Sequence, residues 1–252
     1  MFGYTVNDRI VKESVEILKG FNESRMEKLV GDYSSVGGIP SQIWANEKLG
    51  PRYLRGTTDL DVITKNRVRK SDFRVIEDYI SKKITSEIPD DYTIAFNSKR
   101  TCFEIKLEDD RGGFSIHIPH FTEKKYESQR NRINDILDNS VEKYDINVES
   151  ISDIVIGKLE RSLDNCKNDK EYLRNRLSTM KKKIYQEPAK GRKVVDDIRA
   201  KVVSHIEDDG FWSDEVQKLL RELRITKDAY DITLLGLVDK ENVYDLVSRY
   251  LW

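Results

Sequence analysis

The strongest constraint on the fold is a change of hydrophobic periodicity near Pro119. Before it, strand-type alternation is mixed with helical spacing, and after it we expect no further strands. Five later segments carry apolar residues at helical spacing: 149–163, 170–185, 194–207, 213–223 and 240–251. This order predicts an α/β (α+β) protein, with a small mixed sheet in residues 1–125 and an all-helical C-terminal domain in residues 126–252.

Further elements are expected within the first domain. Helical spacing predicts helices over 8–19, 41–49 and 72–84. Alternating or apolar runs predict strands over 59–63, 102–107 and 114–118. The polar, glycine-bearing segment 108–113 is typical of a hairpin connection, so the last two strands should pair directly.

Composition excludes some classes of protein. The formal net charge is −1, so no global electrostatic attraction to nucleic acid or membrane is expected. No segment approaches the roughly 20 apolar residues of a membrane span, and no membrane partner is predicted. The two cysteines, Cys102 and Cys166, are far apart, which argues against a disulfide framework or a zinc site. A reducing, cytoplasmic location fits this cysteine usage.

Asp59 and Asp61 are the sharpest chemical feature of the sequence. Residues two apart in a strand point to the same face, so both carboxylates should converge while Leu60 faces the core. Two close carboxylates repel each other, and a divalent cation removes that cost. Mg²⁺ binds one or two carboxylates together with substrate phosphates, so the pair predicts a magnesium site. The alternative is a solvated strand end without metal.

A glycine pair, Gly37 and Gly38, precedes the helix predicted over 41–49. Glycine lets the backbone approach a phosphate closely, and the start of a helix offers N–H groups and a favourable dipole to an anion. The alternative is an ordinary tight turn. A phosphate-binding turn beside a carboxylate pair would suit a nucleoside triphosphate.

These residues resemble the signature of the nucleotidyltransferase superfamily, and in detail its AbiEii-type toxin branch. The branch pattern is a Gly-Gly turn, a helix, and then Arg-x-Ser/Thr-x-Asp-x-Asp. The matching stretches are Gly37-Gly38-x-x-Ser41 and Arg55-x-x-Thr58-Asp59-Leu60-Asp61. Two later segments are similar to helical motifs of the branch, with Lys158 in the first and Lys227-Asp228-x-x-Asp231 in the second.

The resemblance implies a function and a set of roles. Members transfer a nucleotide from a nucleoside triphosphate to an acceptor with Mg²⁺, usually two ions. For the toxin branch the implied acceptor is an RNA end such as that of tRNA, and an antitoxin is the implied protein partner. Asp59 and Asp61 would bind the metals, and Asp228 would support the site or act as a base. Nucleotide binding would fall to Gly37, Gly38, Ser41, Arg55, Thr58 and Lys158.

The chain departs from the family pattern at the third carboxylate, which is expected on the next strand of the sheet. Ser115 or His117 occupies that position here, and Glu104 on the preceding strand could substitute. His117 could act as a base or a metal ligand, because the pKa of imidazole lies near neutrality. The alternative is a polar strand residue without a function.

Two other hypotheses remain open from the sequence. The departure at His117 leaves room for a catalytically degenerate member that only binds nucleotide or a protein partner. A helical interaction module with an unrelated α/β domain is the third hypothesis. It predicts that the carboxylate pair is exposed and lies far from Gly37 and Gly38.

Overall fold

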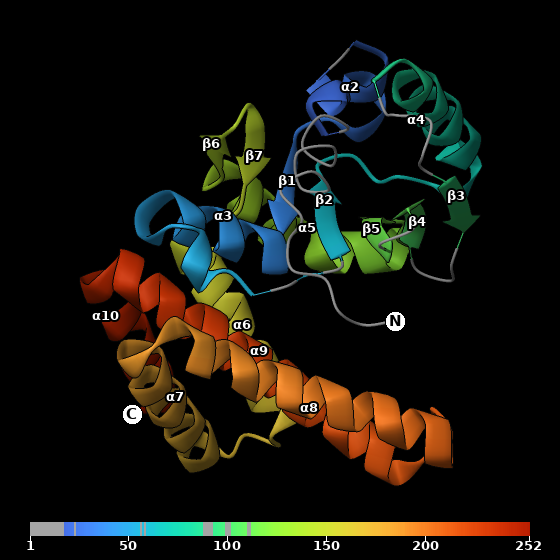
Figure 1. Ribbon diagram of the computed structural model, residues 1–252. Coiled ribbons are helices and arrows are strands. Elements are labelled where there is room, and N and C mark those ends of the chain that lie inside the picture. Colours follow the sequence, from blue (N-terminus) through green and yellow to red (C-terminus); the bar gives the residue numbers. More distant parts are fainter. Residues whose placement is uncertain are drawn as a thin grey trace. The chain divides into compact units, whose positions relative to one another are not determined.

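The computed structural model describes residues 18–22, 24–55, 57, 59–87, 93–98, 102–109 and 112–252 (Figure 1). Most of the helix predicted over 8–19 lies outside these residues. The described chain forms two compact units. The sheet unit takes in the residues up to Pro40 and from Thr57 to Ser150, and the helical unit takes in Ser41–Arg55 and Ile151–Trp252.

A seven-stranded mixed sheet, in the order β3-β4-β5-β2-β1-β7-β6, organises the sheet unit. Its strands are β1 Tyr33–Val36, β2 Asp59–Thr64, β3 Thr93–Ser98, β4 Cys102–Asp109, β5 Gly112–Pro119, β6 Val141–Lys143 and β7 Ile146–Val148. β2 is parallel to β5 and β1 is parallel to β7, whereas the other neighbouring strands are antiparallel. The predicted mixed sheet is therefore confirmed, including the β4–β5 hairpin.

One face of the sheet is apolar and covered by helix α4. Leu60 on β2 is paired with Ile116 on β5, which is paired in turn with Ile105 on β4, and all three side chains are buried. Phe103 on β4 stacks on Phe73, the first residue of α4, with ring centroids 4.8 Å apart. Because side chains alternate along a strand, Asp59 and Asp61 lie on the opposite face.

The sheet unit also contains several helical elements. They are η1 Gly20–Asn22, α2 Ser24–Val30, η3 Lys70–Asp72, α4 Phe73–Glu87 and α5 Glu123–Asp138. Helix α5 lies in a charged, mostly polar stretch of the sequence. This helix buries little apolar surface, with Ile133 as its buried side chain, and its N-cap is Thr122, whose hydroxyl accepts a hydrogen bond from the backbone N–H of Lys125. Its weak apolar stripe explains why periodicity missed it.

The helical unit is built around α9. Its helices are α6 Ile151–Asn165, α7 Lys170–Gln186, α8 Pro188–Asp209, α9 Asp214–Val238 and α10 Lys240–Leu251, and α9 packs against the other four. Most of helix α3 Gly38–Leu49 and the short helix η2 Pro51–Tyr53 belong to the same unit. The predicted C-terminal helices are confirmed, and no helix in the described part of the chain is both long and apolar enough to span a membrane.

The prediction that strands end at Pro119 is wrong. β6 and β7 form a short hairpin beyond it, and β7 joins the sheet because Val148 pairs with Ser35 of β1. Strands of three residues are too short to show alternation, so the sequence carried no signal for them. The compact units accordingly divide after Ser150, beyond the boundary predicted at residue 125, and the segment 41–55 groups with the helical unit because Ala45 lies in its core.

Candidate metal centre

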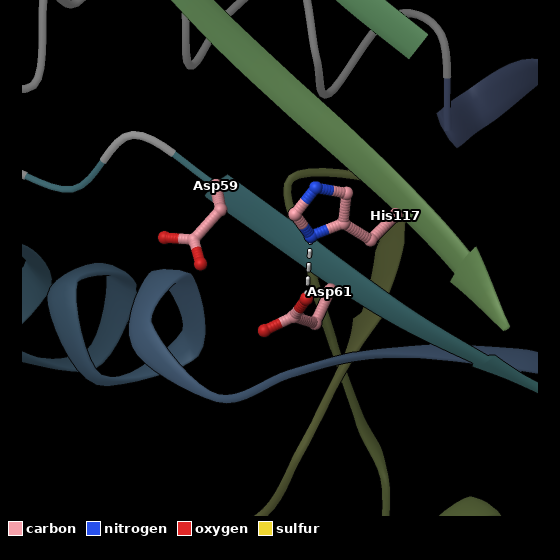
Figure 2. A group of neighbouring side chains, drawn as sticks. All are labelled: Asp59, Asp61 and His117. Atoms are coloured by element: carbon pink, nitrogen blue, oxygen red, sulfur yellow. Dashed lines mark hydrogen bonds and ion pairs between the residues drawn. The ribbon is translucent and has the colours of Figure 1, made fainter. Parts of the chain in front are cut away.

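Three side chains on the polar face of the sheet form a cluster that could hold a metal ion. Asp59 and Asp61 on β2 point to the same side, and His117 leans across from β5 toward Asp61 (Figure 2). Each of the three offers a ligand atom, and these atoms lie within 4.8 Å of one another. The residues therefore fit a single divalent cation, and the predicted convergence of Asp59 and Asp61 is found.

Strand register explains why the cluster forms. In the parallel β2–β5 pair, Asp59 lies opposite Ser115 and Asp61 lies opposite His117. The antiparallel β4–β5 hairpin then places Glu104 opposite His117. Side chains directly opposite each other share a face, so an aspartate, a histidine and a glutamate follow one another across three strands.

His117 contacts carboxylates through both ring nitrogens. Its Nδ1 lies 3.1 Å from Oδ1 of Asp61, and its Nε2 lies 3.4 Å from Oε1 of Glu104. Glu104 is buried, and its other oxygen accepts a hydrogen bond from Nδ2 of Asn97 at 3.3 Å. The hydrogen bond to Asp61 raises the pKa of His117, and burial opposes that rise only in part.

The glycine turn lies directly beside the carboxylate of Asp61. Gly37 has a φ of +84°, which favours glycine, and a Cβ atom at this position would be 3.3 Å from Oδ2 of Asp61. Its N–H donates a 3.0 Å hydrogen bond to Oε2 of Glu149, a buried residue just after β7. Gly38 begins helix α3. The third hypothesis predicted a carboxylate pair that is exposed and far from the glycines; the side chain of Asp61 is 46% exposed, but its position beside Gly37 contradicts the predicted distance.

Two residues at this centre were missed by sequence reasoning. Thr57 donates from its hydroxyl to Oδ1 of Asp59 at 3.1 Å and so orients that carboxylate. Arg55, Thr57, Asp59 and Asp61 fit the Arg-x-Thr-x-Asp-x-Asp spacing, which was the available signal. Glu149 had no such signal, because only the pairing of β7 with β1 brings it to Gly37. Thr58, predicted to bind nucleotide, lies outside the described residues.

The remaining predicted site residues belong to the helical unit. Ser41, in the first turns of α3, is fully buried. Arg55 and Lys158 are also buried, and both bind Asp231 of α9. The guanidinium of Arg55 donates from Nε to Oδ1 of Asp231 at 2.8 Å, and Nζ of Lys158 donates to Oδ2 at 2.8 Å. Gln42 is the third residue that donates to Asp231, from its Nε2 at 3.1 Å.

The charge of Asp231 is strongly stabilised in this network. Complete burial acts to raise the pKa of Asp231, but Arg55 and Lys158 outweigh burial and lower it to about 2. Asp228, predicted to be catalytic, is held nearby on α9. It accepts hydrogen bonds from Nε of Arg161 at 2.9 Å and from the hydroxyl of Ser162 at 3.3 Å. Arg55, Lys158 and Asp228 are therefore each bound to an oppositely charged side chain within the helical unit.

Comparisons with known proteins add no identification. No protein-family model matches the chain, and no curated protein matches it.

Proposed function

We propose that this chain is a divalent-metal-dependent nucleotidyltransferase. The observation that carries the proposal is the convergence of Asp59, Asp61 and the Gly37 turn on one face of the sheet. A carboxylate pair supplies metal ligands, and a glycine turn that leads into a helix supplies a close approach for phosphate. The two features side by side suit a nucleoside triphosphate complexed with a divalent cation.

The chemistry is an in-line displacement at the α-phosphorus of the triphosphate. The oxygen of an acceptor hydroxyl forms a bond to that phosphorus, the bond to the bridging oxygen breaks, and pyrophosphate leaves while the hydroxyl proton passes to a base or to water. A bound divalent cation supplies charge neutralisation for the attacking and leaving oxygens. Asp59 and Asp61 would hold the cation, and Thr57 would keep Asp59 in position. Positioning and electrostatics dominate catalysis of this kind.

The resemblance to the AbiEii-type branch extends the proposal to substrate and partner. The acceptor would be an RNA end such as that of tRNA, and the protein would act in the cytoplasm as the toxin of a toxin–antitoxin pair. Two Mg²⁺ ions are the cofactors that the sequence pattern suggests. Lys158 and Asp228 are each engaged in an ion pair, with Asp231 and with Arg161 respectively, so these pairs would have to open before either residue could take the role that the resemblance implies.

The proposal is tested by transfer from nucleoside triphosphates labelled at the α-phosphate. Each of the four is incubated with total RNA and either Mg²⁺ or Mn²⁺. Asp59→Asn and Asp61→Asn should each reduce transfer at least about 10³-fold, because each removes electrostatic stabilisation that the reaction needs. Asp138→Asn is the matched control, because Asp138 is an exposed carboxylate of the same unit. Undiminished transfer by both variants would refute the proposal.

A catalytically degenerate nucleotide-binding protein is the second candidate. The specific observation in its favour is that His117 lies opposite Asp61, and Ser115 opposite Asp59, on the strand where the family pattern has a third carboxylate. Calorimetry with each triphosphate and a divalent cation separates the two candidates. Binding that depends on Asp61, without transfer to any RNA, would favour the degenerate protein.

A further inference from the structure

The ligand set of the candidate metal centre differs from the set that Mg²⁺ prefers. Mg²⁺ binds oxygen ligands in octahedral geometry, whereas imidazole nitrogen favours first-row transition metals. The cluster combines two carboxylates with one imidazole, that of His117. A third carboxylate at this position would have made an all-oxygen set, so His117 changes the class of ion that the centre should select.

Glu104 prepares His117 to act as a ligand. In the neutral tautomer that donates its Nε2 hydrogen to Glu104, Nδ1 keeps a lone pair, and Nδ1 is the nitrogen that faces Asp61. Glu104 is 4% exposed and is held in turn by Asn97. A carboxylate that accepts the far N–H of a histidine is the usual second contact of metal-binding histidines, and it sets both the tautomer and the ring orientation.

The distance between Nδ1 of His117 and Oδ1 of Asp61 fits a shared ion. In this tautomer both atoms are acceptors, and they lie 3.1 Å apart, so a cation between them is needed. Two ligand atoms about 2.1 Å from one ion and at right angles are about 3 Å apart. A proton would satisfy these two atoms, but only a metal ion would also use Asp59, which offers a third ligand atom within 4.8 Å of one from each of the other two residues.

We propose that Asp59, Asp61 and His117 bind one first-row transition-metal dication in preference to Mg²⁺, and that Glu104 is the positioning residue for His117. The inference deepens the proposed function, since it names the class of metal at that site. The inference rests on the proposed function only for its effect on catalysis, because metal binding can be measured without nucleotide transfer.

The test is a titration of the full-length protein with Mn²⁺, followed by electron paramagnetic resonance of the free ion, with Mg²⁺ added as competitor. We expect the protein to bind Mn²⁺ at least about 10-fold more tightly than Mg²⁺. His117→Ala should weaken Mn²⁺ binding about 10- to 100-fold and change Mg²⁺ binding less than about 3-fold. His117→Asp, which completes an all-oxygen set, should reverse the preference. His205→Ala is the control, because this histidine contacts Lys201 on its own helix.

A spectroscopic signature separates a ligand from a merely structural residue. Pulsed electron paramagnetic resonance of bound Mn²⁺ should detect coupling to the imidazole nitrogen in the wild-type protein and lose it in His117→Ala. Glu104→Ala should weaken Mn²⁺ binding about 10-fold while Mg²⁺ still binds, and retained Mg²⁺ binding shows that the variant is folded at the centre.

Equal affinity for the two ions, or bound Mn²⁺ without nitrogen coupling, would overturn the inference, and transfer activity with Mg²⁺ would then still uphold the proposed function. Conversely, tight Mn²⁺ binding with nitrogen coupling but no transfer from any triphosphate would uphold the inference and remove the function. Failure of every divalent ion to bind would overturn the inference, because His117 would then be bridging Asp61 and Glu104 as an imidazolium cation.

Discussion

Each of the two units contains a cluster of carboxylates and nitrogen-bearing side chains. The two clusters differ in how the negative charge of the carboxylates is compensated. In the helical unit, Asp231 is fully buried and its oxygens accept from Arg55, Lys158 and Gln42. In the sheet unit, the side chain of Asp61 is 46% exposed and lies on the same face as Asp59, with His117 beside it. The charge of Asp231 is neutralised by the protein's own cations, whereas the cluster around Asp61 could hold a cation from solution.

This difference separates a group that stabilises the fold from one that can do chemistry. Removing one member of a buried ion pair leaves its partners charged and desolvated, which is strongly destabilising. A half-exposed carboxylate beside another carboxylate is held at a cost that a bound cation removes. The comparison therefore predicts that substitutions in the two clusters act on different properties.

The largest expected effect is the loss of stability in Asp231→Asn. This change removes the carboxylate that Arg55 and Lys158 share while both cations stay buried, so the free energy of unfolding should fall by about 3–5 kcal/mol. Urea denaturation followed by circular dichroism measures it. Asp197→Asn, at an exposed position of the same unit, should change stability by less than about 0.5 kcal/mol. A loss below about 1 kcal/mol in Asp231→Asn would show that the network contributes little.

A divalent ion should stabilise the wild-type sheet unit through Asp61. At an ion concentration one hundred times its dissociation constant, binding adds about 2.7 kcal/mol to the free energy of unfolding. Thermal unfolding with and without Mn²⁺ measures the shift, and Asp61→Asn should abolish it. Equal stabilisation of Asp61→Asn by the ion would place the metal elsewhere.

Acid should remove the contribution of Asp231 within a defined pH range. Because the pKa of Asp231 is lowered to about 2 in the folded protein, its charged form stabilises the fold above its unfolded pKa of about 3.9. That stability is lost as pH falls from about 4 toward 2, and the loss is about 2–3 kcal/mol. Urea denaturation at a series of pH values measures it. Asp231→Asn should lack this part of the pH dependence, and an unchanged profile in the variant would contradict the assignment.

The smallest expected effect concerns Glu149, which accepts the N–H of Gly37. If this N–H binds a triphosphate, the carboxylate competes with phosphate for it. Glu149→Gln removes the negative charge, so nucleotide affinity should rise about 3- to 10-fold, or about 1 kcal/mol. Calorimetry measures it, with the exposed Glu142→Gln as control. Weaker binding in Glu149→Gln would instead make Glu149 part of the site.

Much of the fold followed from local pattern. Alternation over 102–107 and 114–118 predicted strands that β4 and β5 confirm, and helical spacing predicted the C-terminal helices. The three-residue strands β6 and β7 were missed because they carry too few residues for a period. Helix α5 was missed because it buries only a narrow stripe. Hydrophobic periodicity therefore does not predict elements such as β6, β7 and α5, which form mainly through contacts with other parts of the fold.

The candidate site was predictable only in part. Asp59 and Asp61 share a face because they are two apart on one strand, which is a local property. The contacts of His117 with Asp61 and Glu104 depend on the register of β2, β5 and β4. Lys158 could be predicted to lie on a helix, but its burial against Asp231 depends on how that helix packs against α9.

By itself the sequence determined the carboxylate pair, the glycine turn and the division into a sheet and a set of helices. These depend on spacings of a few residues, because backbone geometry sets the direction in which each side chain points. Only tertiary structure decided which side chains from distant strands meet the pair, and which charged groups are buried with partners. Those outcomes depend on pairing register and helix packing, and neither is encoded within one segment.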